Sequence, residues 1–163
     1  MTPSELVSLA SVARPRRRRR IEIAPSYRSE SRTPSVCRKG ALITGAADVW
    51  RAAADIQDAT QEHVLAFDLN TRHRVIARRV VAIGTLSGVE IHPREVFRAA
   101  ITNGAAAIVL VHNHPSGDSA PSKADIELTA RVRQVGELVG IMLLDHVVVG
   151  GDGYTSIAKT GWR

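Results

Sequence analysis

Two histidines and an aspartate in the second half of the sequence have the types and spacing of a metal-binding group. His112 and His114 follow an apolar run at residues 105–111, which is typical of a buried strand. Because residues i and i+2 of a strand point to the same face, the two imidazoles should lie side by side. With the carboxylate of Asp125 they would form the three-ligand set of a catalytic zinc site, whose fourth position is left for water. Zinc lowers the pKa of such a water to roughly 7, which makes hydroxide available under mild conditions.

Ser122 and Asp125 also have an interpretation that needs no metal. Turn-forming residues 115–121 separate His114 from Ser122, and the Ser-x-x-Asp spacing is that of a helix capping box. The Ser122 hydroxyl would cap the helix, and the Asp125 carboxylate would stay ionised beside the exposed N–H groups of the first turn. Spacing alone leaves the metal site and the plain capping box open.

The elements that must position these residues alternate along the chain. Apolar spacing predicts helices that begin near Thr44, at Pro93 and at Ser122, the last two ending at Gly104 and Gly140. Strands are predicted at residues 62–69, 75–86, 105–114, 141–149 and 154–157. This succession predicts an α/β or α+β class with a mixed sheet in which the strand at residues 75–86 lies on the outside.

Two of the predicted helices carry apolar stripes that should face the core. The stripes are Val96, Phe97, Ala100 and Ile101 in the helix that begins at Pro93, and Leu128, Val132, Val135 and Val139 in the helix that begins at Ser122.

Residues 1–40 differ in composition from the rest of the chain. They hold ten Lys/Arg against three Asp/Glu, whereas residues 41–163 hold twelve against thirteen. Few large apolar residues are present, so we expect this tail to be disordered. Its unbroken arginine run from Arg16 to Arg20 could give a weak, salt-dependent contact with nucleic acid, or it could be a solvated extension.

Composition also indicates a cellular compartment. No apolar run approaches the roughly 18 residues of a transmembrane helix, so no membrane contact is expected. The apolar residues 6–10 precede the arginines, which is the wrong order for a secretory signal. The single cysteine, Cys37, has no partner for a disulfide within the chain. These features predict a cytoplasmic protein.

The spacing His112-x-His114, seven residues, then Ser122-x-x-Asp125 resembles the JAMM motif of MPN/JAB-domain metalloproteases. Residues 92–97 (HPREVF), 112–117 (HNHPSG) and 144–146 (LDH) resemble the RadC family of bacterial proteins. The resemblance covers roughly residues 42–161. It implies an MPN (JAB) domain over residues 42–163, with a cytidine-deaminase-like mixed sheet flanked by helices.

A general base is needed to take a proton from the attacking water and return it to the leaving group. From the residues alone, Glu62, Glu90, Glu95 and Glu127 are candidates, and spacing does not choose among them. The resemblance implies Glu62, because the JAMM glutamate opens the first strand after the first helix. Glu95 is its rival.

The resemblance further implies that Ser122 hydrogen-bonds the oxyanion of the reaction, in addition to capping its helix. Asn113, Asp118 and His146 are interpreted as structural or supporting residues.

The sequence therefore predicts a zinc-dependent hydrolase, with one zinc per chain, that cleaves an amide bond in a peptide or protein. A nucleic-acid-binding module associated with DNA repair is an alternative, as is action on nucleobases or phosphoesters, because fold and metal together do not determine the substrate. The substrate and the oligomeric state are left open.

Overall fold

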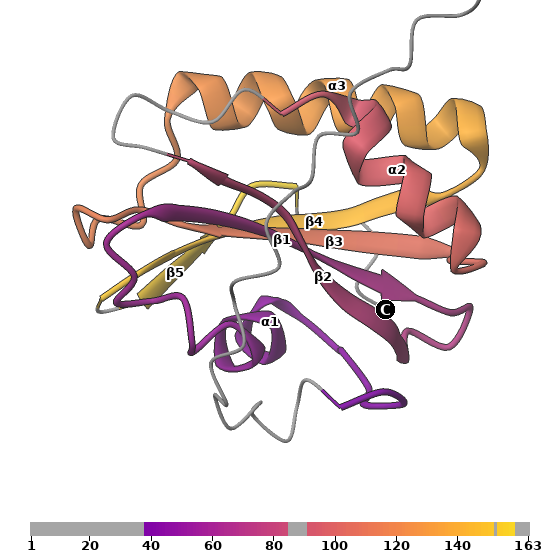
Figure 1. Cartoon of the computed structure of the whole chain (residues 1–163), viewed down its shortest axis with the longest axis horizontal. Coiled ribbons are helices and arrows are strands. Elements are labelled where there is room, and N and C mark those ends of the chain that lie inside the picture. Colours follow the sequence, from indigo (N-terminus) through magenta and orange to yellow (C-terminus); the bar gives the residue numbers. More distant parts are fainter. Residues whose placement is uncertain (1–37, 85–90, 152, 159–163) are drawn as a thin grey trace, which may run out of the picture. The chain divides into compact units, whose positions relative to one another are not determined.

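A computed structural model of the chain describes residues 38–84, 91–151 and 153–158. The elements follow the order α1 (Ala46–Ala52), β1 (Glu62–Leu69), β2 (Val75–Gly84), α2 (Pro93–Thr102), β3 (Ala107–Asn113), α3 (Lys123–Val139), β4 (Met142–Gly150) and β5 (Gly153–Ser156) (Figure 1). Residues 1–37 of the predicted tail, with the run from Arg16 to Arg20 and Cys37, lie outside the described residues, as do residues 85–90. None of the described helices combines the length and the hydropathy that a bilayer-spanning segment requires.

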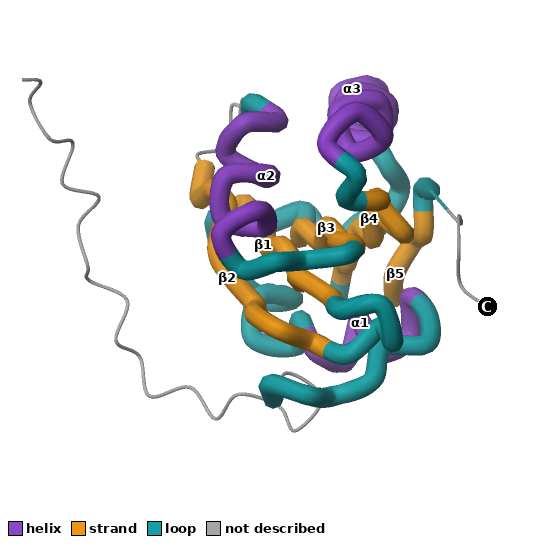
Figure 2. The backbone as a smooth tube through the Cα atoms, turned by 90° about the vertical axis from the view of Figure 1, so that its right-hand side faces the viewer, coloured by secondary structure: helices purple, strands orange, loops and turns teal. Residues whose placement is uncertain are grey.

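The strands that the structure describes form one mixed sheet in the order β2-β1-β3-β4-β5. β1 pairs antiparallel with β2 and β3, β3 is parallel to β4, and β5 is antiparallel to β4. α3 supplies the crossover that a parallel pair requires. α2 and α3 cover one face of the sheet, and α1 covers the other (Figures 1 and 2). The predicted mixed α/β sheet flanked by helices is confirmed, and β2 lies at an edge as expected.

Alternation of side chains along β3 divides the core into two clusters and decides where the histidines point. Val109 and Val111 pack in the cluster that contains the residues of α1. Ile108 and Leu110 pack in the cluster that contains the residues of α2 and α3. Because successive strand residues alternate between faces, His112 continues the second series and points toward the helix that carries Asp125.

Two residues of the predicted apolar stripes are exposed instead of buried. Ile101 is 58% exposed and Val139 is 43% exposed. Successive helix residues are about 100° apart, so Ile101 lies at the margin of the arc occupied by Val96, Phe97 and Ala100. Val139 is the last residue of α3, directly before the left-handed C-cap Gly140. Burial of both side chains was therefore predicted wrongly, because each lies in the final turn of its helix.

Candidate metal centre

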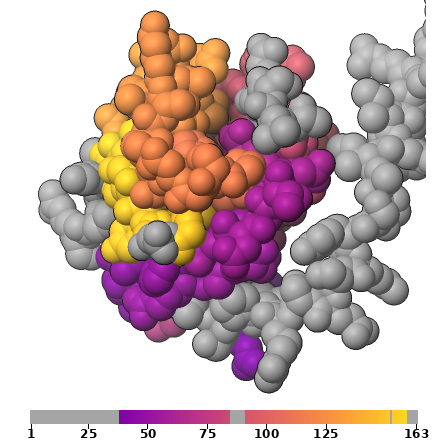
Figure 3. Space-filling view, turned by 90° about the vertical axis from the view of Figure 1, so that its left-hand side faces the viewer, coloured from indigo at the N-terminus to yellow at the C-terminus, as the bar shows by residue number. Residues whose placement is uncertain are grey.

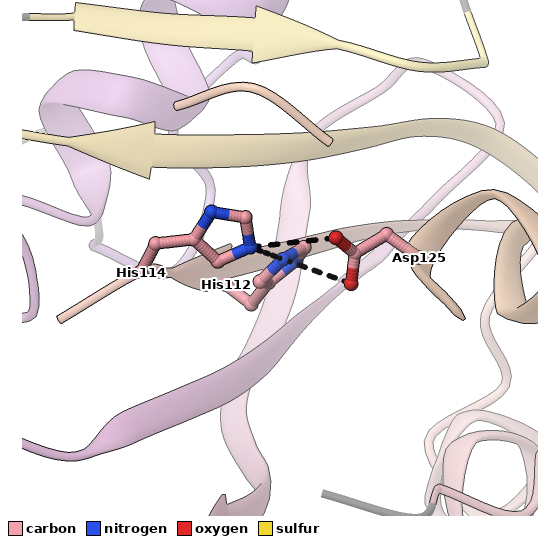
Figure 4. A group of neighbouring side chains, drawn as sticks. All are labelled: His112, His114 and Asp125. Carbon is pink, nitrogen blue, oxygen red and sulfur yellow. Dashed lines mark hydrogen bonds and ion pairs between the residues drawn. The ribbon is translucent and has the colours of Figure 1, made fainter. Parts of the chain in front are cut away.

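The structure brings the three predicted ligands together at one end of β3. His112 Nε2 lies 3.0 Å from His114 Nε2 and 3.2 Å from Asp125 Oδ1. His114 Nε2 lies 3.3 Å from Asp125 Oδ2. One ligand atom from each residue lies within 4.8 Å of the other two, and Figure 4 shows the three side chains pointing toward one another. Three potential ligand atoms that converge in this way could hold a metal ion.

β3 and the chain that follows it deliver the two histidines. His112 is in the strand and only 1% exposed. His114 follows the end of the strand, but its backbone N–H still donates to the backbone carbonyl oxygen of Val149 on β4 at 3.2 Å. Pro115, which cannot donate a backbone hydrogen bond, then ends the extended segment. The parallel pairing with β4 thus continues just far enough to hold the second imidazole beside the first.

The N-terminus of α3 delivers the carboxylate. Ser122 is the N-cap, and its Oγ accepts a hydrogen bond from the N–H of Asp125 at 3.2 Å. In return, the N–H and the hydroxyl of Ser122 both donate to Asp125 Oδ2 at 2.7 Å. The predicted capping box is present, and it orients the carboxylate so that its two oxygens face the histidines. Capping and metal binding are therefore compatible at these two residues.

The surroundings of Asp125 favour its charged form. Burial by itself would raise the pKa of this carboxyl. Hydrogen bonding and charge at His112, together with the hydroxyl and the N–H of Ser122, outweigh burial and lower the pKa well below its ordinary value. An ionised carboxylate is the form that binds a cation.

The ring of His114 is oriented by the loop that follows it. His114 Nδ1 lies 2.8 Å from the backbone carbonyl oxygen of Asp118. A carbonyl oxygen only accepts, so Nδ1–H is the donor, and a neutral ring then has its lone pair on Nε2, toward Asp125. Asp118, interpreted from the sequence only as structural or supporting, therefore acts here through its main chain.

A close approach of two glycines secures this loop. A Cβ on Gly150 would lie 2.2 Å from Gly117 O, so only glycine fits at the end of β4. Gly117 has φ of +82°, which favours glycine, and its carbonyl accepts a hydrogen bond from Gly151 N at 3.2 Å. Figure 3 shows the orange loop lying against the yellow C-terminal strands. The loop that orients His114 thus rests on the end of β4.

His112 makes a buried contact that the sequence did not single out. Its Nδ1 lies 2.8 Å from His146 Nε2 on β4, and His146 Nδ1 lies 2.6 Å from Thr129 Oγ1 on α3. Complete burial, followed by the charge of His112, lowers the pKa of His146 well below its ordinary value. His146 is therefore a neutral residue directly behind one of the candidate ligands.

Glu62 is the first residue of β1, next to the strand that carries the histidines. Val64 pairs with His112 in the antiparallel register. Since strand residues two apart share a face, Glu62 lies on the same face as Val64 and His112, toward the end of β3 where His114 follows. The side chain of Glu62 is partly buried.

Asn113 holds the backbone on both sides of Glu62. Its Oδ1 accepts from the N–H of His63 at 2.7 Å, and its Nδ2 donates to the carbonyl oxygens of Gln61 at 3.1 Å and Ala59 at 3.2 Å. The residue between the two histidines therefore points to the opposite face, as its position in the strand predicts, and clamps the segment that leads into β1.

The other candidate bases are placed differently. Glu95 is 45% exposed in the first turn of α2 and pairs with Arg94 and Arg98 at 3.4 Å each. Glu127 is 61% exposed and pairs with Lys123 at 3.7 Å. Glu90 lies outside the described residues.

Comparison with known proteins identifies the domain. Residues 43–162 match the RadC-like JAB domain. The chain belongs to this family. The chain is 49% identical to a UPF0758 protein of Desulforamulus reducens over 107 residues, which are 66% of this chain and 47% of the relative.

Two further relatives of this RadC-like chain are similar to the same extent. Identity is 46% over 121 residues to a UPF0758 protein of Staphylococcus haemolyticus, covering 74% of this chain and 53% of the relative. It is 47% over 108 residues to the UPF0758 protein YsxA of Bacillus subtilis, covering 66% and 47%. The chain thus spans about half the length of the curated relatives it matches, and their names state no activity.

The donor set of this RadC-like JAB domain suits a divalent metal. Imidazole nitrogens and a carboxylate oxygen are ligands that zinc binds in catalytic sites. Both imidazoles have a partner at Nδ1, which leaves Nε2 of each ring directed at the common point. JAB domains include metallohydrolases, and the residues present here fit a bound metal ion.

Proposed function

We propose that this RadC-like JAB domain is a zinc-dependent hydrolase of the JAMM metallopeptidase type, which cleaves an amide bond in a peptide or protein. The observation that carries the proposal is the convergence of His112 Nε2, His114 Nε2 and the Asp125 carboxylate within 4.8 Å. Three protein ligands of these types are typical of catalytic zinc sites, whereas structural sites have four. We propose one zinc per chain.

The ligands and the metal have separate tasks. When bound, zinc would act as a Lewis acid and lower the pKa of a water molecule so that it attacks near neutral pH. The chain supplies the charge balance, since two neutral imidazoles and one carboxylate leave a net positive site. The Nδ1 contacts of both histidines and the capping hydrogen bonds of Asp125 hold the three side chains in place.

Glu62 is the proposed general base. Its carboxylate would take a proton from the attacking water and deliver it to the nitrogen of the leaving group. Its position on the same sheet face as His112, and the clamp that Asn113 makes on either side of it, support this role. Glu95 and Glu127 already pair with basic side chains on helix surfaces, which makes them weaker candidates.

Ser122 is the proposed hydrogen-bond donor to the oxyanion that develops on the attacked carbonyl. Its hydroxyl proton is directed at Asp125 Oδ2 in the structure, so the hydroxyl would have to turn toward the substrate for this step. Loss of one such donor typically lowers the rate by about a hundredfold or more. The Ser122→Ala variant should bind zinc more weakly, because its hydroxyl orients Asp125, and should still lose rate when zinc is saturating.

Metal content tests the site directly. Protein expressed and dialysed without chelator should contain about one zinc per chain by plasma mass spectrometry, and His114→Ala should lose it. Glu127→Gln, which changes a glutamate on the surface of α3, is the matched control and should keep the zinc. A metal-free wild-type protein from this preparation would overturn the proposal.

The chemistry is tested by comparing Glu62→Gln with wild type on a peptide library. Glu62→Gln should retain zinc but cleave none of the peptides that the wild-type protein cleaves. The Glu95→Gln variant, matched to it in the change made, should retain cleavage. If Glu62→Gln cleaves as the wild type does and Glu95→Gln does not, the base is Glu95.

A further inference from the structure

A buried chain of hydrogen bonds leads from one candidate ligand back to the helix that carries another. It starts at His112 Nδ1, which lies 2.8 Å from His146 Nε2. It continues from His146 Nδ1 to Thr129 Oγ1 at 2.6 Å and ends at the backbone carbonyl oxygen of Asp125, also at 2.6 Å. The side chains of β3, β4 and α3 meet in this chain, which is shielded from solvent because His112, His146 and Thr129 are all buried.

The carbonyl of Asp125 determines the direction of the chain. A carbonyl oxygen only accepts, so its 2.6 Å contact with Thr129 Oγ1 requires the hydroxyl to donate. In the reverse direction the hydroxyl would donate to His146, and two acceptor oxygens would face each other at that distance. Since the one proton of Thr129 is used on the carbonyl, its oxygen must accept from His146 Nδ1–H.

The same reasoning extends to the ligand. A second proton on the fully buried His146 ring would place an uncompensated charge in the core, so its Nε2 carries a lone pair. That lone pair accepts a hydrogen bond from His112 Nδ1–H. The chain therefore fixes the proton on His112 Nδ1 and leaves Nε2, the atom 3.2 Å from Asp125 Oδ1, as the atom that can take a cation or exchange a proton.

We infer that His146 and Thr129 are positioning residues, which hold the proton of His112 on Nδ1 and so present its Nε2 to a metal. This inference rests on the proposed metal site and goes beyond it, because neither residue would touch the metal. His114 obtains the same tautomer from the carbonyl of Asp118. For His112 the carbonyl is that of Asp125, which is connected to the ring through the hydrogen bonds of Thr129 and His146.

The chain also couples two ligands. Thr129 lies one helical turn after Asp125 on α3, and His146 lies on the strand beside His112. A shift of α3 relative to the sheet would therefore disturb the Asp125 carboxylate and the tautomer of His112 together. A residue that only filled the core would need no polar atoms here, where each unpaired one is costly.

Nitrogen NMR of metal-free protein tests the tautomer. At a pH about two units above the ordinary histidine value of roughly 6.5, His112 in wild type should carry its proton on Nδ1. Thr129→Val removes the hydroxyl with little change of shape. In this variant His146 should carry its proton on Nε2 and donate it to His112 Nδ1. The proton of His112 should then lie on Nε2, next to Asp125. Thr129→Ser, the matched control, should retain the wild-type tautomer. A His112 Nδ1 without a proton in wild type would overturn the inference, even if the valine variant fails to fold.

Zinc affinity, measured by competition with a chromophoric chelator, gives the second readout. Removing a partner behind a metal-bound histidine typically weakens metal binding by about 10–100-fold, and we expect this loss in Thr129→Val and His146→Leu. His146→Gln should recover part of it, because its amide oxygen can accept from His112 Nδ1–H. Equal affinity in all variants would refute the inference and leave the proposed hydrolase standing. A wild-type protein that binds no zinc but shows the Nδ1–H tautomer would refute the hydrolase and support the inference.

Discussion

The close contact between Gly150 and Gly117 leads us to predict that a substitution at Gly150, which is not a candidate ligand, changes metal binding. A Cβ on Gly150 would lie 2.2 Å from Gly117 O and 2.9 Å from Gly117 C. The atoms met are backbone, which cannot rotate away as a flexible side chain would, so the loop must move. Gly150→Ala should therefore cost about 1–3 kcal/mol of unfolding free energy, the usual range for an overpacked site.

Displacement of the loop should also weaken metal binding. Gly117 N–H donates to His114 O at 2.9 Å, and the next carbonyl, that of Asp118, orients His114 Nδ1 at 2.8 Å. Movement of Gly117 would therefore disturb two contacts of His114, the one at its backbone carbonyl and the one at its ring Nδ1. Loss of such a partner lowers metal affinity by about 10–100-fold.

Gly151→Ala is the matched control, because a Cβ there meets nothing within 4 Å. It should change the unfolding free energy by no more than about 0.5 kcal/mol. Urea denaturation with a chelator present measures the effect on the fold alone, and zinc competition measures the effect on the site. Equal urea midpoints for the two variants would refute the packing argument. A destabilised Gly150→Ala with wild-type zinc affinity would refute the link from the loop to His114.

Three further predictions concern other parts of the chain. Asn113→Ala loses three hydrogen bonds at about 0.5–1.5 kcal/mol each, so urea unfolding should show a loss of about 2–4 kcal/mol; a loss below 1 kcal/mol would mean that the amide does not clamp the start of β1. Asp48 has a lowered pKa, because hydrogen bonds from Thr44 and the charge of Arg51 outweigh a burial effect that raises it; its stabilising contribution should be complete above pH 3.8, the ordinary value, and be lost as the pH falls below it. Denaturation at a series of pH values should show a shallower acid loss in Asp48→Asn, and identical profiles would contradict this. Finally, replacing the arginines from Arg16 to Arg20 with serine should abolish any DNA binding that weakens with salt, and binding unchanged by this replacement would exclude the tail as its source.

Local features of the fold could be predicted from the sequence because their determinants are close together in the chain. The strand predicted at residues 62–69 is β1 (Glu62–Leu69). α3 begins after its Ser122 cap, and Gly140 ends it in the left-handed conformation. Capping boxes and left-handed C-caps depend on residues within one turn, so the sequence specifies them without the rest of the fold. Residues 70–74 connect β1 to β2.

The sequence did not predict burial correctly where it depends on how a helix is placed on the sheet. The apolar pattern predicted that Ile101 and Val139 face the core, yet both lie in final helical turns and are exposed. A helical period shows which side of a helix is apolar, but it does not show where the sheet beneath that helix ends.

The sequence by itself determined which side chains could bind a metal, since two imidazoles two residues apart on a strand and a carboxylate in a capped first turn follow from local geometry. Only the tertiary structure decided what holds them. His146 reaches His112 because β4 lies parallel beside β3, and Asn113 reaches Gln61 and His63 because β1 lies on its other side. These partners are 34 and about 50 residues apart in the chain, so strand order and register bring them together, and a local pattern carries no information about either.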